Sequence, residues 1–250
     1  MPGFASLSIA SALKVASLNL CTDEYLLLLA KPDEIASVSR LAQDRAESPL
    51  WRSARKYPAN RGAIEQVLGT RPTLVLTMGG GGRSTALLGR RMGIRAIDLP
   101  YPTSIAEVAD NMRRVAAALG NVRRAEPWLT RLNALLTDKP RRPRDAIWVS
   151  GGGISLSAAS PGAQWLALAG LRQRQLPGGR ADLESLLVAP PTVLVRSDYR
   201  RGQMSQGLRW LDHPIVRRLA PRTVTTDGRA WTCAGPLMVD EIERLQRIAQ

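Results

Sequence analysis

The chain contains Glu65-Gln-Val-Leu-Gly-Thr-Arg-Pro-Thr-Leu-Val-Leu76 and, later, Glu184-Ser-Leu-Leu-Val-Ala-Pro-Pro-Thr-Val-Leu-Val195. The two stretches align without a gap and lie 119 positions apart in a chain of 250 residues, with a glutamate, a leucine, a proline and a threonine in common. Each reads as a helix, a turn stopped by proline and a buried strand. We interpret them as equivalent parts of two similar lobes. The alternative is that joints of this kind simply recur in α/β proteins.

Helices and strands alternate around both copies. Such alternation over short loops is typical of parallel sheets covered on both faces by helices. Strands are expected at 15–20, 35–38, 73–78, 95–99, 146–150, 192–195 and 223–226, and helices at 22–30, 63–68, 84–92, 164–169, 183–187 and 237–249. Thr22 is the expected N-cap of the first helix.

Between the copies the alternation stops. Residues 104–119 and 121–137 carry apolar side chains at spacings of three and four, which predicts two consecutive helices. Gly120 is suited to ending the first helix, and Pro127 predicts a kink in the second or its true start. The fold class is therefore α/β, with two lobes of mostly parallel sheet joined by a helical connector. The expected division is 1–13 as an N-terminal segment, 14–119 as the N-terminal lobe, 120–143 as the connecting helix and 144–250 as the C-terminal lobe.

The amino-acid composition limits the functions that are possible for this protein. The formal net charge is +14 and almost all of the positive charge is arginine, so a nucleic-acid partner has to be weighed. The arginines are scattered, and no basic–aromatic motif for single strands is present, so we expect no nucleic-acid partner. No stretch approaches the length of a membrane span.

Residues 1–13 have two interpretations. The small apolar run and Ala10-Ser11-Ala12 are similar to an export signal with its cleavage site, but a basic start is missing. The segment is therefore a weak or truncated export signal, or the start of the sequence is displaced. The alternative is a disordered tail.

A ligand site is expected where the loops follow the strands. In open parallel sheets, ligands bind beyond the carboxyl ends of the strands. Aromatic faces, guanidinium groups and glycine-rich backbone in these loops favour a large, partly planar ligand with anionic or carbonyl edges. The candidate ligand-binding residues are Asn19, Cys21, Tyr57, Arg61, Gly80, Arg83, Gly152, Tyr199, Arg200 and Trp231.

The sequence lacks motifs for phosphate binding, catalysis and metal binding. The glycines at 79–82 fit neither phosphate-loop pattern, because no lysine precedes the hydroxyl pair and the third dinucleotide glycine is replaced. The chain has one histidine, His213, no G-x-S-x-G elbow and no cluster with metal-ligand spacing, so we expect no enzyme, metal or cofactor. Asp240 and Glu241 are expected to be solvated. Cys21 and Cys233 should border the cleft from opposite lobes, where they would either form a disulfide that locks it or remain thiols that contact a metal centre.

Four segments resemble a known family. They are Val15-Ala-Ser-Leu-Asn-Leu-Cys-Thr-Asp-Glu24, residues 60–76 (with Thr73 in place of the usual aspartate), Leu211-Asp-His-Pro-Ile-Val216 and Trp231-Thr-Cys-Ala-Gly-Pro236. In order and spacing they resemble the periplasmic substrate-binding proteins of ABC importers for cobalamin and ferric siderophores, the class III type. The resemblance covers residues 14–250.

The resemblance implies a function. It implies capture of cobalamin, a ferric siderophore or a related chelate such as haem between the lobes, followed by delivery to an ABC permease in the inner membrane. It implies that Glu65 and Glu184 dock on permease arginines, and that the protein is periplasmic and a monomer. Two alternatives stay open at this stage: a tetrapyrrole-processing enzyme or chelatase with a similar fold, and a basic DNA-binding protein.

Overall fold

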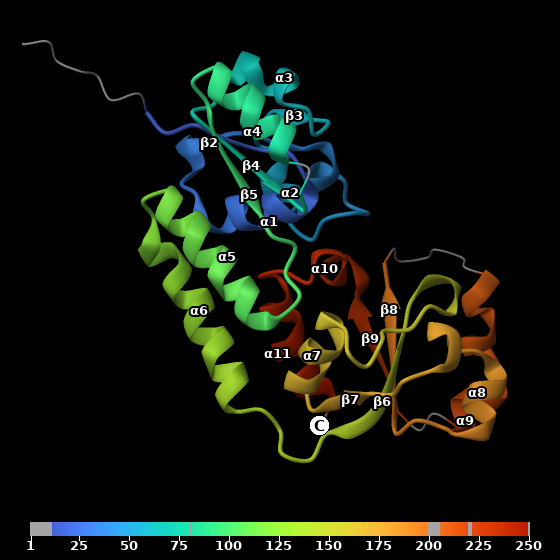
Figure 1. Ribbon diagram of the computed structural model, residues 1–250. Coiled ribbons are helices and arrows are strands. Elements are labelled where there is room, and N and C mark those ends of the chain that lie inside the picture. The colour runs from blue at the N-terminus through green and yellow to red at the C-terminus, as the bar shows by residue number, and fades with distance from the viewer. Residues whose placement is uncertain (1–11, 81, 200–205, 220–221, 250) are drawn as a thin grey trace, which may run out of the picture.

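The computed structural model describes residues 12–80, 82–199, 206–219 and 222–249, which form two α/β lobes beside a pair of long helices (Figure 1). The N-terminal lobe contains a five-stranded sheet in the order β3-β2-β1-β4-β5, and the C-terminal lobe a four-stranded sheet in the order β7-β6-β8-β9. All described strand pairs are parallel. The expected fold class is confirmed.

The N-terminal lobe buries both faces of its sheet. Along β4 the side chains alternate: Leu74 and Leu76 pack toward α1 and α5, while Val75 packs toward α3. The elements are β1 (Val15–Ser17), α1 (Leu20–Leu29), β2 (Ile35–Ser39), α2 (Trp51–Ala54), β3 (Ala59–Asn60), α3 (Ile64–Val67), β4 (Leu74–Met78), α4 (Gly82–Arg91) and β5 (Arg95–Leu99), with 3-10 turns at Pro32–Glu34, Arg40–Gln43 and Leu68–Thr70.

The C-terminal lobe is built in the same way. Trp148 on β6 faces the cluster formed with α7 and α11, and Ile147 and Val149 face the cluster formed with α8 and α9. The elements are β6 (Arg144–Val149), α7 (Pro161–Leu168), β7 (Leu171–Gln173), α8 (Leu183–Val188), β8 (Val193–Asp198), α9 (Pro214–Leu219), β9 (Thr223–Asp227), α10 (Gly228–Cys233) and α11 (Met238–Ala249), with 3-10 turns at Gly151–Gly153, Pro177–Gly179 and Gln206–Asp212.

The duplicated stretches occupy equivalent places. In each copy a short helix, α3 or α8, leads through the proline turn into a central strand, β4 or β8. Strand β4 lies between β1 and β5, and β8 lies between β6 and β9, so the order around the repeat is the same in both sheets. The two copies therefore belong to separate sheets of matching topology, as the pattern predicts.

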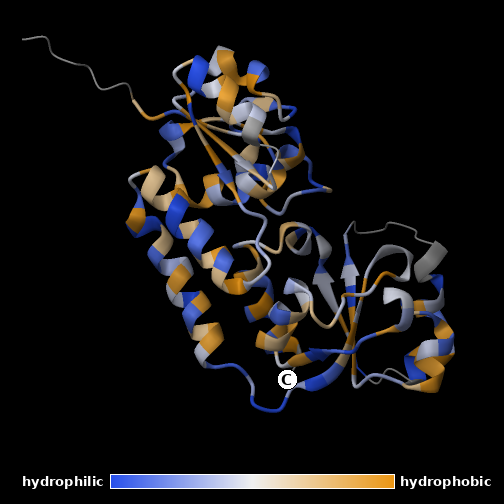
Figure 2. Cartoon of the chain, in the orientation of Figure 1, coloured by the Kyte–Doolittle hydropathy of each residue, from blue (hydrophilic) through white to orange (hydrophobic). Residues whose placement is uncertain are grey.

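Two consecutive helices, α5 (Ile105–Ala118) and α6 (Val122–Thr137), lie between the sheets in sequence and run alongside both lobes (Figure 1). Arg131 of α6 forms ion pairs with Asp240 and Glu243 of α11, which tie the connector to the C-terminal lobe. Pro127 lies inside α6, so the expectation that it marks the start of this helix is wrong. The segment between α6 and β6 is strongly hydrophilic (Figure 2). Among the described residues no helix is both long and apolar enough to cross a bilayer.

Two segments differ from the expected strands and helices. Strand β1 ends at Ser17, and α1 already begins at Leu20, because Asn19 rather than Thr22 is its N-cap: the Asn19 side chain accepts a hydrogen bond from the Thr22 N–H at 3.0 Å. The expected pattern has no helix between residues 226 and 237, whereas α10 occupies Gly228–Cys233 after Asp227 caps it. Both cysteines therefore lie on helices.

These two helices join the lobes covalently. Cys21 of α1 and Cys233 of α10 form a disulfide with a Cα–Cα distance of 5.3 Å. Beside it the Tyr101 hydroxyl donates to the Thr232 carbonyl at 3.1 Å. Gly235 lies against α1, where an added Cβ would be 2.8 Å from Oε2 of Glu24. The residues around 232–237 of the C-terminal lobe thus form a close joint with the N-terminal lobe.

Candidate ligand-binding cleft

A cavity of about 880 Å³ lies between the lobes and is lined by residues of both. Its N-terminal wall follows β2, and its C-terminal wall is made by the carboxyl ends of β8 and β9 together with α10 and α11. The volume is within the range of sites for organic ligands and far above that of a bare ion. The described residues that line it are Asp44, Arg45, Ala46, Trp51, Arg52, Asp198, Tyr199, Thr225, Thr226, Asp227, Arg229, Glu241 and Arg244.

The N-terminal wall owes its shape to local turns. The Asp44 carboxylate accepts from the Ala46 N–H at 2.7 Å, and the Ser48 hydroxyl accepts from the Leu50 N–H at 3.0 Å. Such side-chain bonds to the backbone stabilise turns. They lead the chain into the short helix α2, which places Trp51 and Arg52 at the cavity.

The C-terminal wall depends on strand register and on a glycine. Asp198 and Asp227 are direct partners at the ends of β8 and β9. The next residue, Gly228, has no room for a side chain, because a Cβ there would be 2.8 Å from the backbone of Tyr199. The absence of that side chain lets α10 start directly behind Tyr199.

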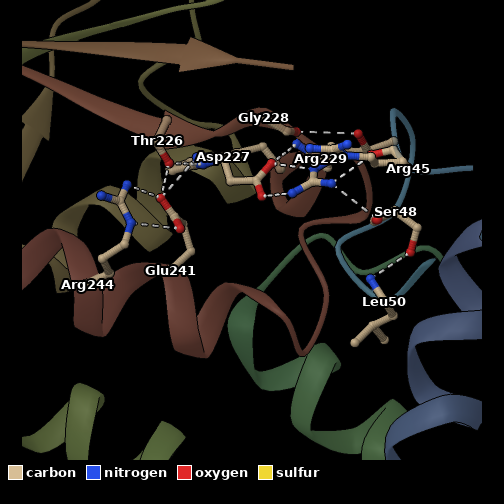
Figure 3. A network of polar contacts seen from close by, with 11 residues as sticks. Arg45, Ser48, Leu50, Thr226, Asp227, Gly228, Arg229, Glu241 and Arg244 are labelled. Atoms are coloured by element: carbon tan, nitrogen blue, oxygen red, sulfur yellow. Dashed lines mark hydrogen bonds and ion pairs between the residues drawn. The ribbon is translucent and has the colours of Figure 1, made fainter. Parts of the chain in front are cut away.

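Arg229 joins the two walls (Figure 3). Its guanidinium donates to both carboxylate oxygens of Asp227, at 2.8 Å and 2.6 Å, and this hydrogen-bonded pair raises the pKa of Arg229. Nη1 also donates across the cleft to the carbonyls of Arg45 at 2.8 Å and Ser48 at 3.3 Å. A second bridge runs from the Tyr199 hydroxyl to Oε2 of Glu47 at 2.5 Å.

Glu241 is a structural part of the cleft. It is 7% exposed, so the expectation that it is solvated is wrong. Its carboxylate accepts from the Thr226 hydroxyl and, at 3.2 Å, from the Asp227 N–H, and it pairs with Arg244 at 2.6 Å. Glu241 thereby holds the end of β9 against α11 (Figure 3).

The N-terminal wall carries arginine and tryptophan. The Arg52 guanidinium lies 4.6 Å from the centroid of the Trp51 ring, and that of Arg55 lies 4.9 Å from it. Both distances are typical of cation–π contacts. Arg52 lines the cavity, whereas Arg55 does not and instead donates to the Gln43 carbonyl.

Of the predicted ligand-binding residues, Tyr199 lines the cavity. Asn19 is used as a helix cap, and the sulfur of Cys21 is part of the disulfide. Tyr57 packs against the core of the N-terminal lobe. Trp231 lies on α10, 5.4 Å from the ring of Trp148, and donates to the Thr226 hydroxyl at 2.7 Å.

Arg61, Gly80 and Gly152 lie in loops or turns outside the cavity lining. Arg61 is exposed and its N–H donates to Gln66, while Gly80 follows β4 with a φ of +82°. Gly152 has a φ of +72° and its carbonyl accepts from Arg180. Arg83 is the second residue of α4, but its side chain, like the whole of Arg200, is outside the described residues. A ligand contact by any of these residues stays a prediction.

The prediction from sequence missed most of the residues that line the cavity. The rule that ligands bind after strands applies to β2 as well, and it would have pointed to residues 40–52, where Trp51 follows a turn-rich stretch. Arg229 follows the end of β9 by two residues, so the same rule covers it, whereas Glu241 and Arg244 carry no such signal. They lie on α11, and only the packing of that helix brings them to the cleft.

No metal-binding cluster is formed by the described residues, since no three histidine, cysteine, aspartate or glutamate side chains come together. The carboxylates that line the cavity instead form ion pairs with arginines and accept hydrogen bonds from backbone N–H groups. This arrangement is suited to binding the organic surface of a ligand rather than a naked cation.

Comparison with known proteins places the fold. No family model matches the sequence, and a search of curated proteins returns no match. Solved structures do match over the whole length, among them the periplasmic heme-binding protein HutB of Vibrio cholerae, with 18% identity, a TM-score of 0.74 and coverage of 95% of this chain and 98% of that one.

Two further structures agree with this placement. The periplasmic heme-binding protein RhuT from Roseiflexus sp. RS-1 has 20% identity, a TM-score of 0.66 and coverage of 95% and 99%. The periplasmic vitamin B12-binding protein BtuF of Vibrio cholerae has 19% identity, a TM-score of 0.65 and coverage of 94% and 95%. The chain has the fold of the class III periplasmic substrate-binding proteins, as the resemblance predicts. At these identities the likeness shows the fold alone.

Proposed function

We propose that the protein is the substrate-binding component of an ABC importer and captures a metal chelate in the cleft between its lobes. The observation that carries the proposal is the cavity of about 880 Å³ lined by the strand ends of the C-terminal lobe and by the segment that follows β2 in the N-terminal lobe. Ligands of two-lobed α/β proteins bind at such facing strand ends. The similar structures named above are described as heme-binding or vitamin B12-binding proteins. The proposal includes a periplasmic location and delivery of the ligand to a permease.

A panel of chelates tests this function. The full chain is titrated with an iron(III) porphyrin, cyanocobalamin and a ferric hydroxamate, and binding is followed by calorimetry and by tryptophan fluorescence. We expect one chelate class to bind with a dissociation constant of about 1 μM or lower. Failure of every chelate to bind would refute the proposal. Turnover of a bound tetrapyrrole would instead favour the alternative hypothesis of a tetrapyrrole-processing enzyme.

The permease partner leads to a second prediction. Glu65 and Glu184 lie in the first turns of the equivalent helices α3 and α8, and both side chains are exposed. Each salt bridge with a permease arginine would be weak alone, so docking depends on both lobes engaging together. Replacing both glutamates by alanine is expected to reduce uptake by about tenfold or more, with each single change having a smaller effect than the pair.

The measurement is chelate uptake by vesicles containing the permease, with calorimetry run in parallel on the free protein. Glu126→Ala, an exposed glutamate on the connector helix α6, is the matched control. Chelate affinity should be unchanged in every variant. Undiminished uptake by the double variant would contradict the docking assignment.

A further inference from the structure

One short helix of the C-terminal lobe is attached to the N-terminal lobe at both of its ends. At its start, Arg229 of α10 donates across the cleft to the carbonyls of Arg45 and Ser48, at 2.8 Å and 3.3 Å (Figure 3). At its end, Cys233 forms the disulfide with Cys21 of α1. The six residues of α10 span only about 9 Å, so whatever fixes Cys233 also limits where Arg229 can lie.

The joint around the disulfide contains an unfavourable contact. Oε2 of the buried Glu24 lies against Gly235, which follows α10, and has no hydrogen-bond partner among the described residues. Leaving such a group buried costs free energy that contact with water would recover. The Tyr101 hydroxyl, which donates to the Thr232 carbonyl at 3.1 Å, acts in the opposite direction. The covalent bond therefore holds together surfaces of which one part gains hydration when they separate.

The two cysteines differ in their access to solvent. Cys21 is partly exposed, whereas Cys233 is 1% exposed. Thiol–disulfide exchange begins when a thiolate attacks one sulfur of the bond and displaces the other. Because Cys21 is the more accessible residue, its sulfur is the point of attack for an external thiol. This route needs no unfolding of either lobe.

We infer that the disulfide is a reversible redox clamp on the ligand cleft. In the oxidised state it holds α10 against the N-terminal lobe and keeps the cavity walls in position, and reduction lets the lobes separate and lowers ligand affinity. Walls that are positioned before the ligand arrives cost less entropy to order on binding. The inference adds regulation to the proposed function, on which its ligand readout rests.

The redox step is an exchange with a dithiol, either a small molecule or the active site of a protein reductant. One thiolate of the dithiol attacks the sulfur of Cys21, and the sulfur of Cys233 leaves as a thiolate. The second thiol of the reductant then completes its own disulfide and releases Cys21. The protons of the dithiol pass to the two cysteines, so the protein is reduced and the dithiol is oxidised.

Hydrogen–deuterium exchange of the full chain tests the clamp without any ligand. The oxidised protein is compared with the protein in dithiothreitol, and peptides from α1, α10 and β6 are followed by mass spectrometry. We expect amides of α1 and α10 to exchange about tenfold faster after reduction, because the contact between the lobes opens more often. Peptides from β6, an inner strand of the C-terminal sheet, should keep their protection.

Ligand affinity is measured without reductant, because thiols also reduce iron(III) and cobalt(III). The probes are an iron(III) porphyrin, cyanocobalamin and a ferric hydroxamate, and Cys21→Ser/Cys233→Ser represents the reduced state. We expect the chelate that binds the oxidised parent to bind the serine variant about tenfold more weakly. Tyr101→Phe is the matched control, since it removes the hydrogen bond beside the disulfide but keeps the bond itself. It should retain the affinity of the parent.

The outcomes separate the clamp from the proposed function. Equal affinity of the parent and the serine variant, or unchanged exchange of α1 and α10 in dithiothreitol, would overturn the clamp and leave the transport function standing. Loss of protection in β6 would also overturn it, because reduction would then unfold a lobe rather than separate two folded ones. Failure of all three chelates to bind the oxidised parent would overturn the chelate-binding function, and the exchange experiment would still decide whether the disulfide clamps the lobes.

Discussion

Replacing Cys21 and Cys233 together by serine is expected to lower the free energy of unfolding by about 5 kcal/mol. The disulfide closes a loop with a sequence separation of 212 residues, nearly the whole chain. In the chain-entropy model, so long a loop restricts the unfolded state strongly, and removing the link makes unfolding correspondingly more favourable. Urea unfolding at pH 7, with midpoint and slope both fitted, measures the change.

Reductant supplies the control for this prediction. It should shift the parent protein toward the curve of the serine variant and leave the variant unaffected. Because the bridge joins α1 of one lobe to α10 of the other, separate unfolding of the two lobes is also expected to become visible in the variant. A loss below about 1 kcal/mol would show that noncovalent contacts alone hold the lobes together.

Replacing Glu24 by glutamine is expected to stabilise the protein by about 1–3 kcal/mol near pH 7, because the amide cannot ionise and avoids the cost of keeping a buried carboxyl protonated above its ordinary pKa, about 1.4 kcal/mol per pH unit. Glu24 is 3% exposed, and its Oε2 has no hydrogen-bond partner among the residues that the structure describes. Burial raises the pKa of Glu24 well above its ordinary value, and the charge of neighbouring Asp23 adds to this, while the Leu237 N–H acts in the opposite direction. No positively charged group contributes to the shift.

The sign of the pH dependence follows from these shifts. Burial also raises the pKa of Asp23, to about 7, although hydrogen bonds from Ser39 and Ser17 lower it in part. A carboxyl group with a raised pKa in the folded state keeps its proton longer when folded than when unfolded. Its favourable contribution is therefore complete below its ordinary pKa and is lost as the pH rises through the folded value. Stability should fall between about pH 4 and pH 7 and beyond.

Thermal unfolding from pH 4 to pH 9 checks this. Glu24→Gln removes one of the two buried carboxyls, so its profile should be flatter than that of the parent but should retain the part due to Asp23. Glu126→Gln, an exposed acid on α6, is the control and should follow the parent profile. A Glu24→Gln profile parallel to that of the parent would refute the assignment.

The periodic parts of the fold were predictable from sequence. The apolar runs of β4 and β8 and the three–four spacing in α5 and α6 reflect burial of one face, and this signal is local. The short elements α2, β3 and β7 were missed, because two to four residues carry too little pattern. Asn19 was passed over as a cap since Thr22, a residue of the same capping class, lies three positions later.

The sequence by itself determined that two similar α/β units flank a helical connector, because hydrophobic periodicity and the repeated helix–proline–strand joint are properties of neighbouring residues. Only the tertiary structure decided which side chains meet across the gap. It paired Cys21 with Cys233, brought Arg229 to the carbonyls of Arg45 and Ser48, and left Oε2 of the buried Glu24 without a hydrogen bond from the described residues. Contacts between residues so distant along the chain depend on how the lobes pack, and no local pattern encodes that packing.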